Sequence, residues 1–595
     1  MSGGGVDSLD GRRIFDAFNS GARQVIDHQD QLNRINVFPV PDGDTGTNLA
    51  ATLSHAMGST RVTDSVGDTI VSMSDAAIIG ARGNSGAIFA QFLGGLSEAL
   101  SQLPIVTLEH FAHAVRNARD RAYEAVSSPR EGTILSVISA WSHSLVEHAR
   151  ESRTFHELFE RTLPVAEDSL RRTPEQLDVL RQSGVVDAGA QGFCHFIRGA
   201  RDYLFTGKAP SSTDSPVPDL DASHDVPSAE ESITFRYCTE VMLSPAGKGT
   251  KGLSAEIESL GDSLIVVNAG GKARVHLHTD RPADLVEALR RRGRILAQKA
   301  EDMRAQFQTV HRRKYRIALV TDSACDLPRE ILDEHQVHVA AMRIMFDDAE
   351  YIDGVTITAE GFARRQDGPG PHATTSQPPS AELHHLFAWL SSHYESVIAV
   401  HLSGAMSGTF AASAREAAKI PGARITVIDS HHVSGSLGLI VLRAAEAIKG
   451  GAGHDEVVRL IESTISKARI LVSVRTLDYM VRGGRVSRLG GILGKLVNLK
   501  PIVSVDEEGK SRLYGKAFSV RANIDKILSM VAEDHAAHPM RAYAIVHAGV
   551  PERALQVAAR LRDITGMEPR YVMEISPVVR LNSGPGALSV VTMRE

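Results

Sequence analysis

The chain has 595 residues, more than one hydrophobic core usually supports, so we expect several domains. Its composition, 43% hydrophobic and 23% charged with a formal net charge of −6, is ordinary for a globular protein and argues against nucleic-acid binding. The three cysteines, odd in number and far apart, argue against a disulfide framework. The N-terminal MSGGGVDSLDGRR lacks the apolar core of a signal peptide, and no run approaches the roughly 18 apolar residues of a membrane span. We expect a soluble cytoplasmic protein.

The first third of the chain is predicted to be helical. Apolar residues recur at helical spacing from Ile14 to Ile26, and similar patterns run through 66–79, 86–101, 108–126 and 133–149. The following stretch GKAPSSTDSPVPDLDASHDVPSAEES is rich in Pro, Ser and Asp, a composition typical of a linker. We therefore place an all-helical domain at 1–207 and a linker at 208–232.

The rest of the chain mixes strand and helix patterns. Residues 233–305 alternate β-rich runs such as DSLIVVNAGGKARVHLHT with helical ones, which predicts a small α+β domain. From 315 to 595 the short runs RIALV, SVIAV, ARITVI, RILVSV and RAYAIV, several followed by helical patterns, predict an α/β sheet. Ligands of such sheets bind beyond the carboxyl ends of the strands, which points to the loops TDSACDLP, HLSGAMSGT and DSHHVSG.

The stretch NVFPVPDGDTGTN, residues 36–48, carries two carboxylates in a stiff loop. Its prolines restrict the backbone, so the segment delivers Asp42 and Asp44 into a turn, two residues apart, where both can bind one divalent ion. Thr47 and Asn48 then open a helix, whose N-terminus favours anions. A simple Asx-turn with helix capping is the alternative.

A second candidate is the glycine-rich GARGNSGAIFAQFLGG, residues 80–95. Backbone amides and the Ser85 hydroxyl at the start of its helix could hold a phosphate, although close helix packing at small residues would explain the same pattern. No GxxxxGK[ST] occurs, which excludes a P-loop nucleotide site.

Cys238 and the pair His276 and His278 form the third candidate. Residues two apart on a strand point to the same face, so both imidazoles can reach one ion, and a thiolate is a natural further ligand for zinc. Two half-buried surface histidines are the alternative.

The N-terminal motifs support a resemblance to a known family. NVFPVPDGDTGTN, GARGNSGAIFAQFLGG, SSPREGTILSVIS and VVDAGAQGF occur in an order that resembles the nucleotide-binding subunit of fatty acid kinase. The first domain of that subunit is similar to the ADP-binding (DhaL) subunit of bacterial dihydroxyacetone kinase. The resemblance covers roughly residues 10–205. It implies ATP or ADP and Mg²⁺ as cofactors, and Zn²⁺ in a middle domain with a Cys and an HxH pair at matching positions.

Residue roles follow from this resemblance. Asp42 and Asp44 would hold the magnesium ions and act as catalytic residues, and Asn36 would replace a third acidic ligand of the dihydroxyacetone kinases. The other nucleotide-site residues would be Thr47 and Asn48, Ser85 and Gly86 at the phosphates, Thr133 near the nucleoside, and Asp187 with Gly189 in a lid. Cys238, His276 and His278 would bind the zinc ion.

Residues 315–595 resemble a DegV-family fatty-acid-binding protein. The motifs are VTDSACDLP, TTSQPPS, HLSGAMSGT, LDYMVRGGRVS and SGPGA. By this resemblance Thr375 and Ser407 would hydrogen-bond the fatty acid carboxylate, and Arg482 and Arg485 would lie near the interface with the kinase domain. The chain departs from the family where a histidine usually touches the carboxylate, because Asn582 stands there. Arg580, two residues earlier, is the competing partner for the carboxylate.

The combined resemblance implies a single-chain fatty acid kinase that converts ATP and a fatty acid into acyl phosphate and ADP. A carboxylate is already ionised at neutral pH, so no general base is required. The alternatives are a kinase for a small substrate such as dihydroxyacetone and a lipid-binding carrier regulated by nucleotide. We expect a fatty acid, an acyl-phosphate-using acyltransferase and a second copy of the chain as partners, together with a peripheral membrane contact.

Overall fold

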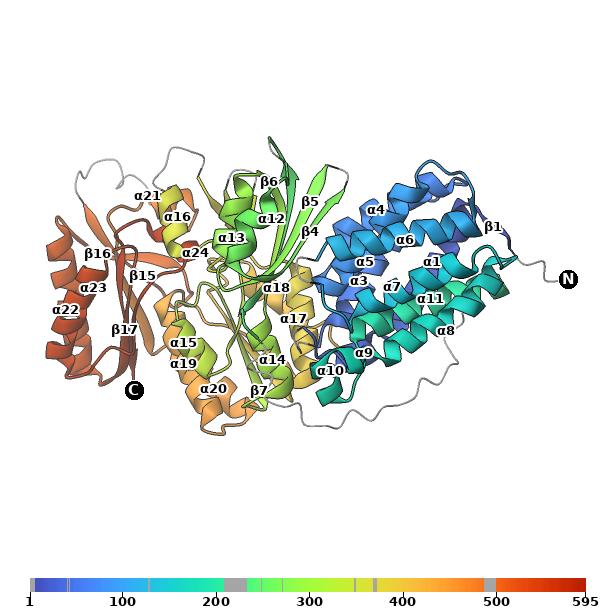
Figure 1. Ribbon diagram of the computed structural model, residues 1–595. Helices are drawn as coiled ribbons and strands as arrows, with labels where there is room; N and C mark the ends of the chain where they lie inside the picture. The colour runs from blue at the N-terminus through green and yellow to red at the C-terminus, as the bar shows by residue number, and fades with distance from the viewer. Residues whose placement is uncertain are drawn as a thin grey trace. The chain divides into compact units, whose positions relative to one another are not determined.

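The computed structural model describes residues 6–39, 41, 43–126, 129–207, 233–247, 249–269, 271–346, 349–366, 372–485 and 499–595. The chain divides into two compact units, Met1–Val310 and His311–Glu595 (Figure 1). Asp42, the whole predicted linker 208–232 and the end of the LDYMVRGGRVS motif lie outside the described residues. In the described part of the chain, no helix is both long and apolar enough to cross a membrane.

The N-terminal unit begins with a helical bundle. Its helices are α1 (Gly11–Asp27), α2 (Gln29–Arg34), α3 (Thr45–Ser59), α4 (Val66–Gly80), α5 (Gly83–Leu100), α6 (Leu108–Glu124), α7 (Ile134–His148), α8 (Phe155–Arg171), α9 (Thr173–Gln176), α10 (Asp178–Ser183) and α11 (Ala188–Thr206). A two-residue ladder joins β1 (Ser8–Leu9) to β2 (Val106–Thr107). The predicted helical domain is thus confirmed.

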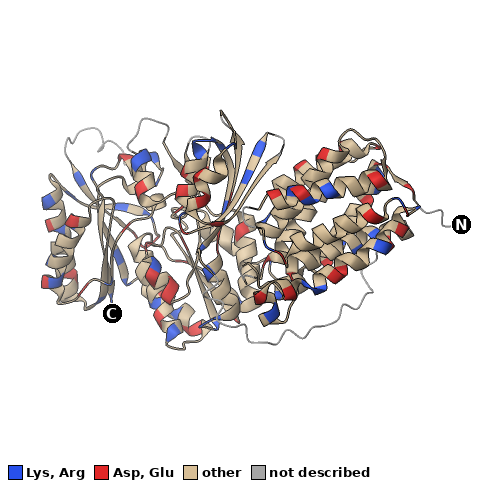
Figure 2. Cartoon of the chain, viewed as in Figure 1, with Lys and Arg blue, Asp and Glu red and all other residues tan. Residues whose placement is uncertain are grey.

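Aromatic packing and helix caps explain the bundle. Phe193 of α11 stands edge-on to Phe92 of α5 with ring centroids 5.3 Å apart, and Phe196 stands edge-on to Phe89 at 4.8 Å. Such edge-to-face pairs stabilise a core beyond the area they bury. The helix α1 starts where the Asp10 side chain accepts a hydrogen bond from a backbone amide of its first turn. Acidic and basic residues are interspersed along the helices (Figure 2).

The same unit contains a small α+β domain. Its elements are β3 (Tyr237–Pro245), α12 (Leu253–Ile257), η2 (Glu258–Leu260), β4 (Asp262–Ala269), β5 (Lys272–Thr279), α13 (Pro282–Arg290), β6 (Gly293–Asp302) and α14 (Met303–His311). The four strands form an antiparallel sheet in the order β4-β5-β3-β6. Alternate residues of β3 and β5, including Leu243 and Leu277, are apolar and fully buried. The second face of these strands carries Cys238 and Glu240 on β3 and Arg274, His276 and His278 on β5.

The C-terminal unit is an α/β structure. It contains β7 (Ile317–Asp322), α15 (Arg329–Glu334), β8 (His338–Ala340), β9 (Arg343–Phe346), β10 (Ala349–Ile352), α16 (Ala359–Gln366), β11 (Thr374–Ser376), α17 (Ser380–His393), β12 (Ser396–His401), α18 (Thr409–Ala417), β13 (Ile425–Asp429), α19 (Gly435–Lys449) and α20 (His454–Ile465). It continues with β14 (Ala468–Ser473), α21 (Asp478–Arg482), β15 (Lys500–Val505), β16 (Ser511–Ala517), α22 (Val520–Ala537), β17 (Met540–His547), α23 (Pro551–Thr565), β18 (Val572–Glu574), α24 (Pro577–Ser583) and β19 (Leu588–Arg594).

The strands of this unit are divided among three sheets instead of the one that the sequence predicts. A parallel four-stranded sheet has the order β13-β12-β7-β8, and a mostly antiparallel six-stranded sheet has the order β16-β15-β14-β19-β17-β18. A third, antiparallel sheet has the order β10-β9-β11. Strand patterns are local, whereas the choice of partner strand depends on distant residues, and this explains the difference.

Candidate functional site

Four helices of the bundle begin close together. A β-carbon added at Gly83, the first residue of α5, would lie 2.5 Å from the side-chain nitrogen Nδ2 of Asn48 on α3. A β-carbon at Gly86 would lie 2.4 Å from Thr52 Oγ1, one turn further along α3. The first turn of α5 therefore packs directly against the first turns of α3, and only glycine fits at these contacts. Gly83 also has a positive φ of 60°, which favours glycine.

The starts of α7 and α11 adjoin the same place. A β-carbon at Gly189 of α11 would lie 2.8 Å from Ser85 Oγ and 3.5 Å from Cβ of Ile134, the first residue of α7. The four motifs that are separated in the sequence thus meet at the N-terminal ends of α3, α5, α7 and α11. Helix N-termini present unpaired amide donors and a partial positive charge, an arrangement that suits an anion such as a phosphate.

The loop before α3 is held by side-chain hydrogen bonds. Asn36 is buried, and its side-chain oxygen accepts a hydrogen bond from Thr45 Oγ1. The Thr47 amide donates to Asn33 Oδ1 at 3.0 Å, while Asn33 Nδ2 donates to Thr47 Oγ1 at 2.9 Å. Asp44 is half-buried and immediately precedes α3. The loop thus brings oxygen atoms of Asn36 and Asp44 to the N-terminal end of α3, and oxygen is the ligand type that Mg²⁺ prefers.

Thr133 and Asp187 act as helix caps at this end of the bundle. Thr133 Oγ1 accepts a hydrogen bond from the Leu135 amide at 3.3 Å, and Asp187 Oδ1 accepts one from the Ala190 amide at 2.7 Å. Burial raises the pKa of Asp187 to about 6, although backbone hydrogen bonds oppose the shift. Capping is therefore a structural role of both residues, in addition to the nucleotide roles that the resemblance implies.

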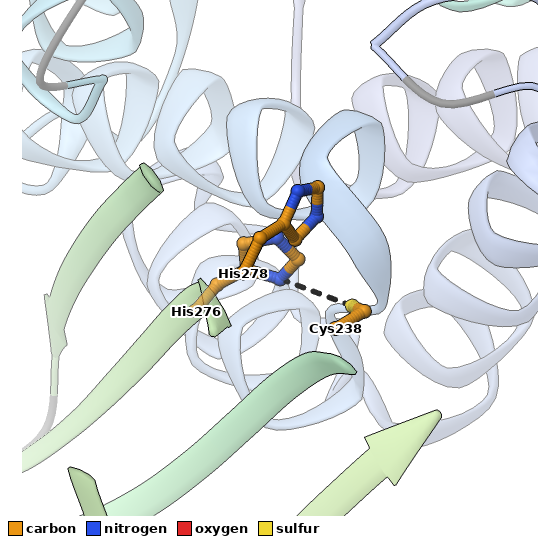
Figure 3. Close-up of side chains that lie close together, drawn as sticks. All are labelled: Cys238, His276 and His278. Carbon is orange, nitrogen blue, oxygen red and sulfur yellow. Dashed lines mark hydrogen bonds between the residues drawn. The ribbon is translucent and has the colours of Figure 1, made fainter. Parts of the chain in front are cut away.

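Cys238, His276 and His278 lie together on the polar face of the middle sheet (Figure 3). Cys238 on β3 is opposite His278 on β5. One ligand atom from each side chain lies within 4.8 Å of those of the others, and Cys238 Sγ is 3.9 Å from His276 Nδ1. Burial raises the pKa of the Cys238 thiol well above its usual value.

A carboxylate faces each of the two histidines. Glu240 Oε1 lies 3.5 Å from His276 Nδ1, and Asp262 Oδ1 lies 3.5 Å from His278 Nδ1. The other ring nitrogen of His276, Nε2, is buried and has no hydrogen-bond partner among the described residues. Histidine ligands of metals usually donate their second ring nitrogen to a carboxylate. A thiol, two imidazoles and these carboxylates form a donor set that fits zinc.

Glu240 and Arg274 connect this sheet to the helical bundle, and neither belongs to a motif recognised in the sequence. The Gly83 amide donates to Glu240 Oε1 at 2.6 Å, and Arg274 Nη1 lies 2.9 Å from Glu240 Oε2. Arg274 also donates to the backbone carbonyls of Ile79, at 2.6 Å, and Ala81. The signal was strand alternation, because Glu240 is two residues from Cys238 and Arg274 two from His276.

The charge of Glu240 is stabilised by its neighbours. Burial disfavours the carboxylate, but a hydrogen bond with His276 and the charges of Lys299 and Arg274 outweigh this effect and lower the pKa of Glu240 to about 2. The contact between Glu240 and the glycine-rich turn is therefore a charge-assisted hydrogen bond at neutral pH.

The C-terminal unit contains a cavity at the carboxyl ends of β7, β12 and β13. The three loops that the sequence pointed to all contribute to its lining, through residues such as Ala324, Ser407 and Ser434. The polar lining includes Thr375, Ser407, Arg485 and Asn582, and apolar lining residues are Met342, Leu402, Met406, Ile470, Met480 and Val579.

The structure separates the two candidate carboxylate partners of this cavity. Arg580 does not line it, because its buried guanidinium forms an ion pair with Glu574 at 3.0 Å. Asn582 does line it, with Nδ2 donating to the Val578 carbonyl at 3.3 Å. Asn582 is therefore better placed than Arg580 to replace the family histidine, since the Arg580 cation is already paired with Glu574.

The two arginines predicted at an interface have different surroundings. Arg485 lines the cavity, and its Nη2 lies 3.5 Å from Thr375 Oγ1. Arg482 stacks on the ring of Tyr479 at 5.0 Å and lies 3.1 Å from His372 Nε2, where both side chains are exposed. The structure thus places a cation beside the predicted carboxylate site, a role that the sequence did not assign to Arg485.

Family comparisons cover most of the chain. The model of the DAK2 domain matches residues 39–202, that of the FakA-like middle domain of fatty acid kinase matches 234–310, and that of uncharacterised proteins of the DegV family matches 316–595. An uncharacterized protein of Staphylococcus saprophyticus is 32% identical over 322 residues, 52% of this chain and 58% of the relative. Protein YloV of Bacillus subtilis is 33% identical over 326 residues, 51% of this chain and 57% of that protein.

The chain spans somewhat more than half the length of these curated relatives. Among solved structures, DegV, described as a fatty acid binding protein from Bacillus subtilis, is 28% identical, with a TM-score of 0.44, and the match covers 47% of this chain and 100% of that one. A fatty-acid-binding DegV family protein from Thermus thermophilus is 26% identical, with a TM-score of 0.43 and coverage of 47% and 100%. By the family models, the chain joins a DAK2 domain, a FakA-like middle domain and a DegV-family region in one polypeptide.

Proposed function

We propose that the chain is a single-chain fatty acid kinase that transfers the terminal phosphoryl group of ATP to a fatty acid carboxylate. The main support for this proposal is the combination of two features in one chain. A chain with a DAK2 domain also has a cavity with an apolar lining, and Thr375 and Ser407 lie in its wall. A fatty acid needs this combination, apolar side chains for its tail and hydroxyl donors for its carboxylate.

In the N-terminal unit, the proposal assigns nucleotide binding to the end of the bundle where four helices begin. Ser85 and Gly86 would contact phosphates through amides at the start of α5, and Asp187 with Gly189 would close the site. Asp44 and Asn36 offer the oxygen atoms that Mg²⁺ prefers, with Asp42 as the third proposed ligand. Bound Mg²⁺ would neutralise charge on the phosphates, which is the main requirement of phosphoryl transfer.

In the C-terminal unit, Thr375 and Ser407 would hold the fatty acid carboxylate by hydrogen bonds. Arg485, 3.5 Å from Thr375 Oγ1, would balance its negative charge. The carboxylate is ionised at neutral pH and can attack phosphorus without a general base. The acyl phosphate product would be consumed by an acyl-phosphate-using acyltransferase.

Cys238, His276 and His278 are proposed to bind zinc. Their arrangement across β3 and β5 would tie the two strands together, which is a structural and not a catalytic use of the metal.

The test is incubation of the full chain with labelled ATP, Mg²⁺ and oleate. We expect an acid-labile acyl phosphate whose formation requires oleate, and loss of the product in the Asp44→Ala variant. Phosphorylation of dihydroxyacetone but not oleate would identify a small-substrate kinase. Oleate binding without phosphoryl transfer would identify a carrier regulated by nucleotide.

A further inference from the structure

Glu240 lies between the three candidate zinc ligands and the glycine-rich turn at the start of α5. Oε1 accepts a hydrogen bond from the Gly83 amide at 2.6 Å and lies 3.5 Å from His276 Nδ1. Oε2 lies 2.9 Å from Arg274 Nη1. A single carboxylate thus contacts a candidate zinc ligand and the first amide of the helix at which phosphate binding is proposed.

The surroundings leave this carboxylate little freedom. Glu240 is 6% exposed, so its charge depends on these partners rather than on water. Arg274, which pairs with Glu240, also binds the backbone carbonyls of Ile79 and Ala81. The turn between α4 and α5 is therefore held through both carbonyls and the Gly83 amide by two residues of the middle sheet.

The turn itself has little room to move. Gly83 has a φ of 60°, and a β-carbon there would lie 2.5 Å from the side chain of Asn48. Two residues further along, the Ser85 hydroxyl is so close to α11 that a β-carbon on Gly189 would lie 2.8 Å from it. A displacement of the Gly83 amide would consequently change the position of Ser85 and the neighbouring amides.

We propose that Glu240 is a positioning residue that couples zinc binding at Cys238, His276 and His278 to nucleotide affinity at the start of α5. The inference rests on the proposed function, because it takes the nucleotide and zinc sites from there. With zinc bound, the ring of His276 is fixed, and His276 in turn fixes Glu240 and the Gly83 amide. Without zinc, the ring can reorient, and the turn loses one of its supports. Binding couplings are reciprocal, so nucleotide would also slow zinc loss.

Two nearby carboxylates serve as matched controls. Asp262 faces the other histidine, His278, at 3.5 Å, and is about half exposed. Glu301 is opposite Cys238 on β6, and its ion-pair partner is Lys299 at 2.6 Å. The described contacts of these two carboxylates are within the middle domain. Asp262→Asn therefore alters support of a zinc ligand alone, and Glu301→Gln alters charge on the same sheet.

The experiment measures the dissociation constant of ADP by calorimetry, using the full chain in excess Mg²⁺. Each protein is measured zinc-loaded and after treatment with a zinc-selective chelator, and its zinc content and circular dichroism are recorded. In wild-type protein we expect zinc removal to weaken ADP binding by about 5- to 150-fold, the usual range of couplings between sites. Glu301→Gln should keep the wild-type zinc dependence of ADP affinity. Asp262→Asn should release zinc at a lower chelator concentration and keep the same zinc dependence of ADP affinity.

The Glu240→Gln variant tests the coupling directly. Its zinc-loaded form should bind ADP as weakly as the zinc-free wild type, and zinc removal should cause no further loss. If zinc removal does not change the ADP affinity of the wild-type protein, the inference is overturned. It is also overturned if zinc removal weakens ADP binding by Glu240→Gln as much as by the wild type. If Glu240→Gln does not fold, Glu240→Asp is measured in its place, because its shorter side chain cannot reach both His276 and Gly83.

The outcomes separate this inference from the proposed function. Zinc-dependent ADP binding without acyl phosphate formation overturns the proposed substrate and leaves the coupling in place. A wild-type protein that binds no ADP overturns both.

Discussion

Replacing Thr375 by valine tests the proposed carboxylate site most directly. Valine has nearly the same shape as threonine, so the change replaces the hydroxyl donor by a methyl group at the same position. Thr375 Oγ1 lies 3.5 Å from Arg485 Nη2 in the wall of the cavity. A hydrogen bond to a charged group contributes about 1.5–3 kcal/mol, so Thr375→Val should weaken oleate binding by about 10- to 150-fold.

Thr374→Val is the matched control for this variant. Thr374 precedes Thr375 on β11, so its side chain points to the other face of the strand, and it is exposed. The assay is a calorimetric or fluorescence titration of delipidated protein with oleate. Thr374→Val should bind like wild type. Equal oleate affinity of the two valine variants would refute the assignment of Thr375 to the carboxylate.

Three further predictions concern single residues. Asp44→Ala should abolish acyl phosphate formation and, as a change in a half-buried loop residue, shift the unfolding temperature by no more than about 4 °C. Arg580→Ala should destabilise the fold by about 1–3 kcal/mol in chemical denaturation, because Glu574 loses its guanidinium partner, and should leave oleate affinity unchanged. Asn582→Ala, at a residue that lines the cavity, should weaken oleate binding. The raised pKa of Asp187, about 6 against 3.8, means that the folded state holds its proton more tightly, so this contribution to stability is present below pH 4 and lost as pH rises through 6. Asp187→Asn, which retains the cap, should therefore raise the unfolding temperature at pH 7 and not at pH 4, as measured by calorimetry.

Periodicity in the sequence was sufficient to predict the helices of the bundle and the α/β character of the C-terminal unit. It was insufficient to predict which strands share a sheet. RILVSV and RAYAIV have the same strand character as RIALV, but they pair with β19 in the six-stranded sheet, whereas RIALV lies in the parallel sheet. Strand propensity depends on a few neighbouring residues, whereas pairing depends on contacts across more than 100 residues of this chain, such as Ile470 with Val591.

The candidate sites were predictable to different degrees. The two-residue spacing of His276 and His278, together with Cys238, was enough to predict a cluster, since strand geometry fixes which side chains share a face. Glu240 is also two residues from Cys238, but its partner is the backbone amide of Gly83. Every residue except proline has such an amide, so the sequence does not indicate which one Glu240 binds. The charge of Arg580 makes it a candidate partner for the carboxylate, but nothing in the sequence shows that Arg580 forms an ion pair with Glu574.

The position of β19 in the six-stranded sheet has a consequence for biosynthesis. The strand Leu588–Arg594 follows all other described strands in sequence, yet it lies between β14 and β17 and joins them. A ribosome must therefore translate past Arg594 before the two halves of this sheet can pair. Ser583 and Ser589, which line the cavity, are also made late. Any lipid in this cavity is consequently acquired after most of the polypeptide has been synthesised, and the nascent chain must keep the edges of β14 and β17 from pairing with other strands until then.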